Sequence, residues 1–249
     1  MTGKKGLKVN DVTAARATRV AWPAIYPKAI DANSVEWLIE DQLCLIPNYL
    51  TAKECSAFIA TCSSQQLLPS PPAKKGEAHR TNARFSSDDP SFAQRLWDAG
   101  LSLCCSSWLA IEGKSKGLPA SGLNSNIRVY RYEPSQLFGA HYDGSVTDAA
   151  NGKRSEWTLL IYLSGAQDGV EGGETVFYKD HSRKGGADRE VVAPLDRGTA
   201  LLHRHGDVSD CDSLGSNKAD IAKQACMLHE GRPPIKGTKW VLRSDVMFG

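Results

Sequence analysis

Short segments of strand-forming residues dominate the second half of this 249-residue chain. They are rich in β-branched and aromatic residues, and Gly, Asp and Ser separate them. Helix-forming patterns come earlier in the chain. Helices followed by many short strands predict an α+β, mainly β fold: a jelly roll, or double-stranded β-helix, with supporting N-terminal helices. The strands are expected at residues 127–133, 158–163, 174–178, 191–195, 199–202 and 239–248.

The first half of the chain divides into an arm and two helices. Residues 1–35 are polar and weakly patterned, which indicates a flexible N-terminal arm, and residues 36–249 are expected to form a single domain. Thr51 and Glu54 have capping-box spacing, so a helix is expected at residues 52–64, after a short strand near residues 41–48. Pro90 is expected to open a second helix that runs to about Leu109.

Composition argues against several classes of partner. The 30 basic and 28 acidic side chains leave a formal charge of only +2, so neither nucleic acid nor a membrane surface is an expected partner. No run of about eighteen apolar residues predicts a membrane span, and the N-terminus lacks the apolar stretch of a secretory signal. We expect an intracellular protein, cytoplasmic or nuclear, and the basic N-terminus leaves organelle import open. The seven irregularly spaced cysteines are expected to be reduced thiols.

His141 and Asp143 lie two residues apart, just after a predicted strand. In extended backbone, side chains two residues apart leave the same face, so these two can chelate one metal ion. Two imidazoles and one carboxylate can occupy one face of an octahedral Fe(II) and leave the other positions to a cosubstrate and O2. The pair therefore predicts a metal site that needs a second histidine from a distant strand.

Three histidines compete for that place: His203, His205 and His229. A metal-bound 2-oxo acid needs a fixed cation for its far carboxylate, and Lys239 lies ten residues beyond His229, after a Pro-Pro turn. The residues ten positions beyond the other two histidines carry no charge. The predicted metal ligands are therefore His141, Asp143 and His229.

Five ordered blocks between residues 128 and 248 resemble the Fe(II)- and 2-oxoglutarate-dependent dioxygenases, specifically the prolyl 4-hydroxylase-like branch. The blocks are RVYRYEPSQLFGAHYDGS, WTLLIYLS, GGETVFY, GTALLH and LHEGRPPIKGTKWVLRSDVMF. The resemblance implies that His141, Asp143 and His229 bind iron and that Lys239 pairs with the C5 carboxylate of 2-oxoglutarate. It implies that Tyr132 helps to hold that carboxylate. Arg243, which shares a strand face with Lys239, is a second candidate anchor.

The same resemblance implies an enzyme. Fe(II), 2-oxoglutarate and O2 are the expected cofactors, with ascorbate as a candidate addition, and the reaction releases succinate and CO2 while it hydroxylates a C–H bond. A prolyl residue in a protein or peptide is the leading substrate. Another side chain or a small molecule is the alternative. Ser135 stands where this family often has glycine, and this departure leaves the metal site intact.

Other interpretations of the sequence stay open. A structural zinc module could use Cys226 and His229, whose spacing suits tetrahedral zinc, with His203, His205 and Cys211. A non-catalytic binding protein on the same fold is a further alternative. Arg80 and Arg84 are either a solvated edge or a site for an acidic substrate. The Gly172 to Thr175 block is expected to be a structural turn rather than part of the site.

Overall fold

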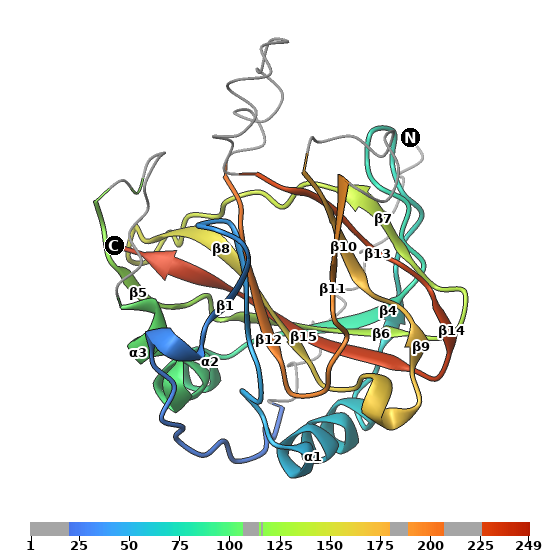
Figure 1. Ribbon diagram of the computed structural model, residues 1–249, viewed down its shortest axis with the longest axis horizontal. Helices are drawn as coiled ribbons and strands as arrows, with labels where there is room; N and C mark the ends of the chain where they lie inside the picture. The colour runs from blue at the N-terminus through green and yellow to red at the C-terminus, as the bar shows by residue number, and fades with distance from the viewer. Residues whose placement is uncertain (1–19, 107–114, 116, 180–188, 207–225) are drawn as a thin grey trace, which may run out of the picture.

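The strands of the protein form two main antiparallel sheets and one short strand pair (Figure 1). The computed structural model describes residues 20–106, 115, 117–179, 189–206 and 226–249. The larger sheet has the order β1 (Glu36–Ile39), β2 (Leu43–Ile46), β12 (Ala200–Arg204), β8 (Arg154–Tyr162), β15 (Lys239–Phe248), β6 (Asn126–Tyr132), β4 (Ala83–Asp88) and β3 (Leu68–Pro69), with β5 (Ala120–Leu123) paired to β15. The smaller sheet has the order β11 (Glu190–Ala193), β10 (Thr175–Tyr178), β13 (Leu228–Gly231) and β7 (Phe138–His141), and β14 (Pro234–Lys236) pairs with β9 (Glu171–Gly172). This mainly β architecture confirms the predicted jelly-roll class.

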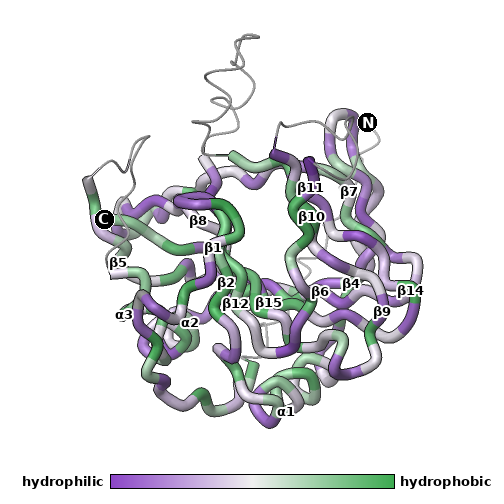
Figure 2. Tube along the Cα trace, viewed as in Figure 1, coloured by the Kyte–Doolittle hydropathy of each residue, from purple (hydrophilic) through white to green (hydrophobic). Residues whose placement is uncertain are grey.

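The central strands of the larger sheet are covered on both faces. Along β8, Leu159 and Ile161 pack into a cluster with the helices, whereas Leu160 and Tyr162 face a second cluster with residues of the smaller sheet. All ten residues of β15 are buried. Neither face of these strands meets water, and Figure 2 shows the apolar residues along β2 and β12.

Helix α1 (Ala52–Ser63) begins as the capping box predicts. The Thr51 hydroxyl accepts the backbone N–H of Glu54, and the Glu54 carboxylate accepts the backbone N–H of Thr51 at 2.8 Å. Its apolar face, which includes Phe58, joins the helix-side cluster behind the larger sheet. The predicted helix is therefore confirmed, one residue shorter at its end.

The helix that Pro90 opens is not continuous. It is divided into α2 (Pro90–Leu96), a π-helical turn η2 (Trp97–Leu101) and α3 (Ser102–Cys105). Gly100 interrupts it with a φ of 145°, and a Cβ at this position would lie 2.9 Å from the Cδ1 atom of Ile30. A single helix from residue 90 to 109 is wrong, because this close approach requires a glycine in a non-helical conformation. The last residues of the predicted helix lie outside the described part of the chain.

The predicted arm is packed against the domain from residue 20 onward. Trp22 stacks on Phe92 with ring centroids 4.3 Å apart, and Ile30 is buried beside the helices. A 3-10 turn, η1 (Ala32–Ser34), precedes β1, and a second, η3 (Ala166–Asp168), follows β8. The predicted boundary of the flexible arm, at residue 35, is therefore too far along the chain. A few large side chains anchor residues that the polar composition had indicated as flexible. Residues 1–19 lie outside the described residues.

Most of the described cysteines are free thiols, and all five of these are buried: Cys44, Cys55, Cys62, Cys104 and Cys105. Cys226 is disulfide-bonded, so the expectation of reduced thiols is wrong at this position. Spacing along the chain does not determine which sulfur atoms meet in space. Within the described residues, no helix combines the length and the apolar character that crossing a membrane requires.

Replacing Trp22 tests the docking of this segment. Trp22→Ala is expected to lower the free energy of unfolding by about 3–5 kcal/mol, because it leaves a cavity between three aromatic rings. Chemical denaturation measures this change. The matched control is Tyr26→Ala, since Tyr26 lies in the same segment and is 67% exposed. Equal effects of the two substitutions would contradict the packed arrangement.

Candidate active site

Three side chains with metal-binding atoms meet between the two sheets. His141 ends β7, and the antiparallel pairing with β13 sets His229 directly opposite it. Asp143 follows His141 by two residues. One ligand atom from each of the three lies within 4.8 Å of the others. The structure thus brings together the three residues that the sequence predicts as ligands.

Backbone carbonyls orient both imidazoles. The Nδ1 atom of His141 lies 2.8 Å from the carbonyl oxygen of Gly139, and Nδ1 of His229 lies 2.9 Å from that of Met227. Because a carbonyl only accepts hydrogen bonds, each Nδ1 carries the proton and each Nε2 presents a lone pair. The Nε2 atom of His141 is buried with no hydrogen-bond partner. An orphaned nitrogen in this orientation fits a metal ligand.

Both histidines are neutral. Burial lowers the pKa of His141 to about 4, and Asp143 acts in the opposite direction with less effect. Burial also lowers the pKa of His229 well below its usual value, and the neighbouring imidazoles of His141 and His203 add to the shift. Neutral imidazole is the form that coordinates metal ions, so no proton has to leave before binding at neutral pH.

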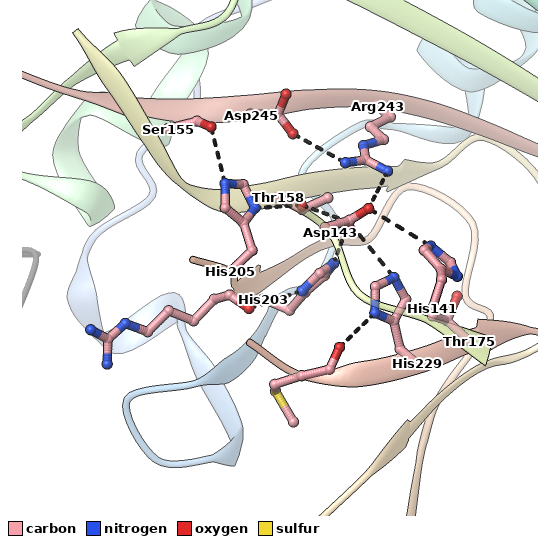
Figure 3. A network of polar contacts seen from close by, with 12 residues as sticks. His141, Asp143, Ser155, Thr158, Thr175, His203, His205, His229, Arg243 and Asp245 are labelled. Carbon is pink, nitrogen blue, oxygen red and sulfur yellow. Dashed lines mark hydrogen bonds and ion pairs between the residues drawn. The ribbon is translucent and has the colours of Figure 1, made fainter. Parts of the chain in front are cut away.

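The carboxylate of Asp143 is buried and held from several sides (Figure 3). Arg243 on β15 donates to Oδ1 at 2.8 Å, and Thr158 on β8 donates to Oδ2 at 2.8 Å. The Nε2 atom of His203 lies 3.2 Å from Oδ2. Burial alone would raise the pKa of Asp143, but the charge of Arg243 and the contact with His203 outweigh it and hold that pKa well below its usual range. The carboxylate is therefore charged and fixed in direction.

A chain of hydrogen bonds supports Asp143 from behind. Ser155 and Thr158 contact the two ring nitrogens of His205, at 3.0 Å and 2.9 Å. The Thr158 hydroxyl donates its hydrogen to Asp143, so it accepts a hydrogen bond from Nδ1 of His205. Nε2 of His205 is then unprotonated and accepts from the Ser155 hydroxyl. Burial lowers the pKa of His205 to about 4, which keeps this ring neutral. His205 thus positions a candidate ligand through Thr158.

Lys239 lies at the other end of the same space, opposite Tyr132 in the pairing of β15 with β6. Its Nζ atom donates to the carbonyl oxygen of Gly173 at 2.6 Å and lies 3.5 Å from the hydroxyl of Thr175. The rings of Tyr132 and Tyr162 flank it, with centroids at 5.2 and 5.5 Å. Burial lowers the pKa of Lys239 to about 7, against the weaker opposite effect of Glu174.

One pocket joins Lys239 to the candidate ligands, with about 390 Å³ of empty space that includes its opening to solvent. Leu160, Val241 and Phe138 form part of its apolar wall. Its polar lining consists of Tyr130, Tyr132, His141, Asp143, Thr175, His229, Lys239 and Arg243. A cation at one end and metal ligands at the other are chemically complementary to a small dicarboxylate.

The structure also distinguishes the two candidate anchors. Tyr132 and Lys239 are neighbours on the paired strands β6 and β15 and both line the cavity, whereas Arg243 is engaged with Asp143 and lies 3.4 Å from Asp245. The guanidinium of Arg243 therefore compensates a buried carboxylate. Lys239, by contrast, contacts no carboxylate among the described residues, which makes it the better candidate anchor.

Sequence reasoning missed four contributors to this site: Gly173, Thr175, Thr158 and His203. The first two belong to a block that was expected to be only a turn. His203 was considered only as a ligand, although the period of two from Leu201 points it toward the inner face of the sheet. No pattern in the sequence indicates that Thr175 and Lys239 meet, because their strands come together only in the fold.

The zinc-module alternative is wrong. Cys226 is disulfide-bonded and so has no thiolate for zinc. His205 is occupied by Ser155 and Thr158, and His229 groups with His141 and Asp143. Cys211 lies outside the described residues.

Comparisons with known proteins relate part of the chain to one superfamily. Residues 127–244 match the 2OG-Fe(II) oxygenase superfamily. A probable prolyl 4-hydroxylase 3 of Arabidopsis thaliana is 26% identical over 200 residues, which cover 78% of this chain and 64% of the relative. Prolyl 4-hydroxylase 2 of the same plant is matched over 62% of its length. The chain thus spans less than two thirds of the length of these curated relatives.

Solved structures share the fold at lower identity. A Pseudomonas putida prolyl-4-hydroxylase aligns with a TM-score of 0.51 at 14% identity, covering 82% of this chain and 92% of the other. A non-heme alpha-ketoglutarate-dependent carbocyclase from nogalamycin biosynthesis aligns with the same TM-score at 15% identity, covering 83% and 80%. At these identities the likeness shows the fold alone.

The burial of Lys239 predicts a pH-dependent stability. In the unfolded chain this lysine has its ordinary pKa of 10.5, so between pH 7 and 10.5 the unfolded state binds a proton that the folded state lacks, and stability rises with pH. Below pH 7 the folded state bears the full cost of a buried charge. Lys239→Met is therefore expected to raise the Tm most at pH 6 and progressively less toward pH 10.

Thermal melts of metal-free protein across that range measure the difference. Lys236→Met is the matched control, because Lys236 lies on the same segment and is 68% exposed in its ion pair with Glu171. A Tm difference between Lys239→Met and the unsubstituted protein that is the same at pH 6 and pH 10 would contradict the buried, cavity-facing lysine.

Proposed function

We propose that this chain, whose residues 127–244 match the 2OG-Fe(II) oxygenase superfamily, is an Fe(II)- and 2-oxoglutarate-dependent dioxygenase that hydroxylates a prolyl residue of a peptide or protein. The observation that carries this proposal is the single cavity with Lys239 at one end and the three candidate ligands at the other. We also propose that residues 36–249 act as one catalytic domain. Its strands β1 and β2 pair into the same sheet as β12 and β15, which supports this.

His141, Asp143 and His229 would hold the metal. Bound Fe(II), with 2-oxoglutarate and O2, supplies the oxidising chemistry: one oxygen atom enters succinate as CO2 leaves, and the other enters the substrate as a hydroxyl group. Two neutral imidazoles and one carboxylate are the donor set of this class of site, and they leave the remaining metal positions open.

Lys239 would hold the C5 carboxylate of 2-oxoglutarate. With a pKa of about 7, the amine takes up a proton readily when a dianion enters the cavity. The Thr175 hydroxyl, 3.5 Å from Nζ, and the Tyr132 ring opposite form the rest of this end. The apolar walls of Leu160 and Val241 limit the water around the ion pair, which strengthens it.

Asp143 and its supports would keep the metal site fixed during turnover. Arg243 and Thr158 hold both carboxylate oxygens, so the donor direction of Asp143 does not depend on a bound ion. Outer contacts of this kind contribute to metal affinity, and their loss typically weakens it about 10–100-fold.

The name of the Arabidopsis relative supports a prolyl substrate, because that protein is called a probable prolyl 4-hydroxylase. A second candidate is oxidation of another side chain or of a small molecule. The fold does not decide between the two, because a carbocyclase and a prolyl hydroxylase align with the same TM-score. We keep an intracellular location, cytoplasmic or nuclear, as a proposal: the five buried free thiols support it, whereas the disulfide of Cys226 counts against it.

The test is succinate formation by purified protein with Fe(II), ascorbate and 2-oxoglutarate, across proline-containing peptides and small molecules. Mass spectrometry follows the gain of one oxygen atom. Such a gain on proline supports the main proposal, and a gain on another group supports the second candidate. No succinate under any condition would favour a non-catalytic binding protein on the same fold.

Loss of a metal ligand is expected to abolish turnover. His141→Ala and Asp143→Ala should each remove succinate formation, because two donors cannot hold the ion in the required orientation. His79→Ala is the matched control and should retain activity, since its side chain is exposed. Tightly bound iron, measured by elemental analysis, should be lost in parallel. Full activity of the His141 variant would refute the assignment.

Loss of the anchor is expected to act on the cosubstrate. Lys239→Met should raise the KM for 2-oxoglutarate roughly 10–100-fold, the range expected for a hydrogen bond to a charged group. Iron content should stay unchanged, because Lys239 does not belong to the group of candidate metal ligands. An unchanged KM would instead place the C5 carboxylate elsewhere, with Arg243 as the next candidate.

A further inference from the structure

A second, wider cleft reaches the candidate ligands from the other side. Its empty volume is about 1740 Å³, including the open mouth, and its lining includes residues of the segment 71–78 and of β4, β6 and β7. It shares Tyr130, Phe138, His141, Asp143 and Arg243 with the inner cavity. A substrate that enters here meets the metal site on the side away from Lys239.

Four arginines line this cleft, and two of them are neutralised. Arg243 donates to Asp143, and Arg128 pairs with Asp245. Arg80 and Arg84 have no carboxylate partner among the residues that the structure describes. The cleft therefore carries two guanidinium groups whose charge nothing in the described chain balances.

Aromatic rings hold Arg80 in place. Its guanidinium carbon lies 3.6 Å from the ring centroid of Phe138 and 5.2 Å from that of Tyr130. Its Nε atom is buried without a hydrogen-bond partner. Main-chain contacts fix the same segment. Arg80 forms an isolated β-bridge with Phe138, and the backbone N–H of Gly139 donates to the carbonyl oxygen of His79 at 2.7 Å. A stacked guanidinium keeps its planar edge of donors available, which suits a carboxylate.

Arg84 reaches the same cleft from β4, where it lies opposite Tyr130. The carboxylates that line the cleft do not offset these charges. Asp143 is engaged with Arg243 and Thr158. Glu77 and Lys74 also line the cleft, and their opposite charges cancel, which leaves Arg80 and Arg84 in excess. The cleft is thus cationic beside the site of oxidation.

We propose that Arg80 and Arg84 bind a carboxylate side chain of the substrate, so that the protein selects prolines in acidic peptide segments. The proposal rests on the proposed function for the identity of the oxidised residue. The arginine pair then acts as a specificity element: it sets the position of an acidic residue relative to the proline that reaches the metal site.

Binding to metal-free protein tests the proposal without turnover. The probes are fluorescein-labelled nine-residue peptides with a central proline, with one glutamate placed at each other position in turn, and the matched set with glutamine. Fluorescence anisotropy gives the Kd of each. At one position or more, glutamate is expected to bind at least about tenfold more tightly than glutamine, and Arg80→Gln with Arg84→Gln should bring that ratio close to one.

Two further variants keep the test clear. Arg131→Gln is the matched control: Arg131 lies next to Tyr130 on β6, but its guanidinium lies 5.8 Å from the Trp240 ring, on the helix side of the sheet. This variant should keep the full preference for glutamate. Arg84→Glu should reverse the preference toward peptides with lysine in the glutamate position, which a general loss of folding cannot do.

The outcomes separate this proposal from the proposed function. Equal binding of glutamate and glutamine peptides, binding of neither set, or a preference that survives both arginine substitutions overturns the arginine subsite. A fluorescein-labelled single-stranded DNA is measured in the same assay, and tighter binding of this DNA than of every peptide overturns it as well. Succinate formation without peptide, measured in parallel, tests the dioxygenase activity alone, so each proposal can fail while the other stands.

Discussion

The buried charge of Asp143 is the constraint on which the arrangement of this site depends. A carboxylate in the interior is stable only if other groups compensate its charge and satisfy its lone pairs. Here Arg243 on β15 and Thr158 on β8 donate to it, and the Nε2 atom of His203 on β12 lies 3.2 Å from it. Three neighbouring strands of the larger sheet therefore converge on one carboxylate, while the smaller sheet supplies His141 and His229. The candidate metal site lies where the two sheets face each other.

At the far end of the inner cavity, the buried charged group is a lysine without a carboxylate partner among the described residues. Lys239 is 2% exposed, and among the described residues it contacts only neutral acceptors, at Gly173 and Thr175. Stability alone does not favour a buried amine without a carboxylate, because desolvation is then uncompensated. An anionic ligand supplies the missing charge. The uncompensated burial of Lys239 thus destabilises the ligand-free protein and also favours the binding of a dicarboxylate.

Paired and unpaired arginines divide the site into structural and recognition elements. Arg243 and Arg128 are bound to Asp143 and Asp245 and belong to the framework behind the metal ligands. Arg80 and Arg84 face the wider cleft without such partners among the described residues, and Arg80 is fixed by stacking on Phe138. Because Phe138 also stacks on His141 at 3.6 Å, substrate recognition and the metal site share one strand, β7.

The sequence by itself determined the class of fold and the candidate ligands, because both depend on local patterns. Strand-forming segments between Gly, Asp and Ser predict β6, β8, β10, β11, β12 and β15, and the spacing of Thr51 and Glu54 predicts the start of α1. The two-residue spacing of His141 and Asp143, with Lys239 beyond His229, predicts the convergence that the structure contains. Only the tertiary structure decided the rest. Four features depend on contacts between residues distant in the chain: the break at Gly100, the docking of Trp22, the bond from Arg243 to Asp143 and the contact of Thr175 with Lys239. The physical reason is that packing, burial and strand register arise only when the sheets form.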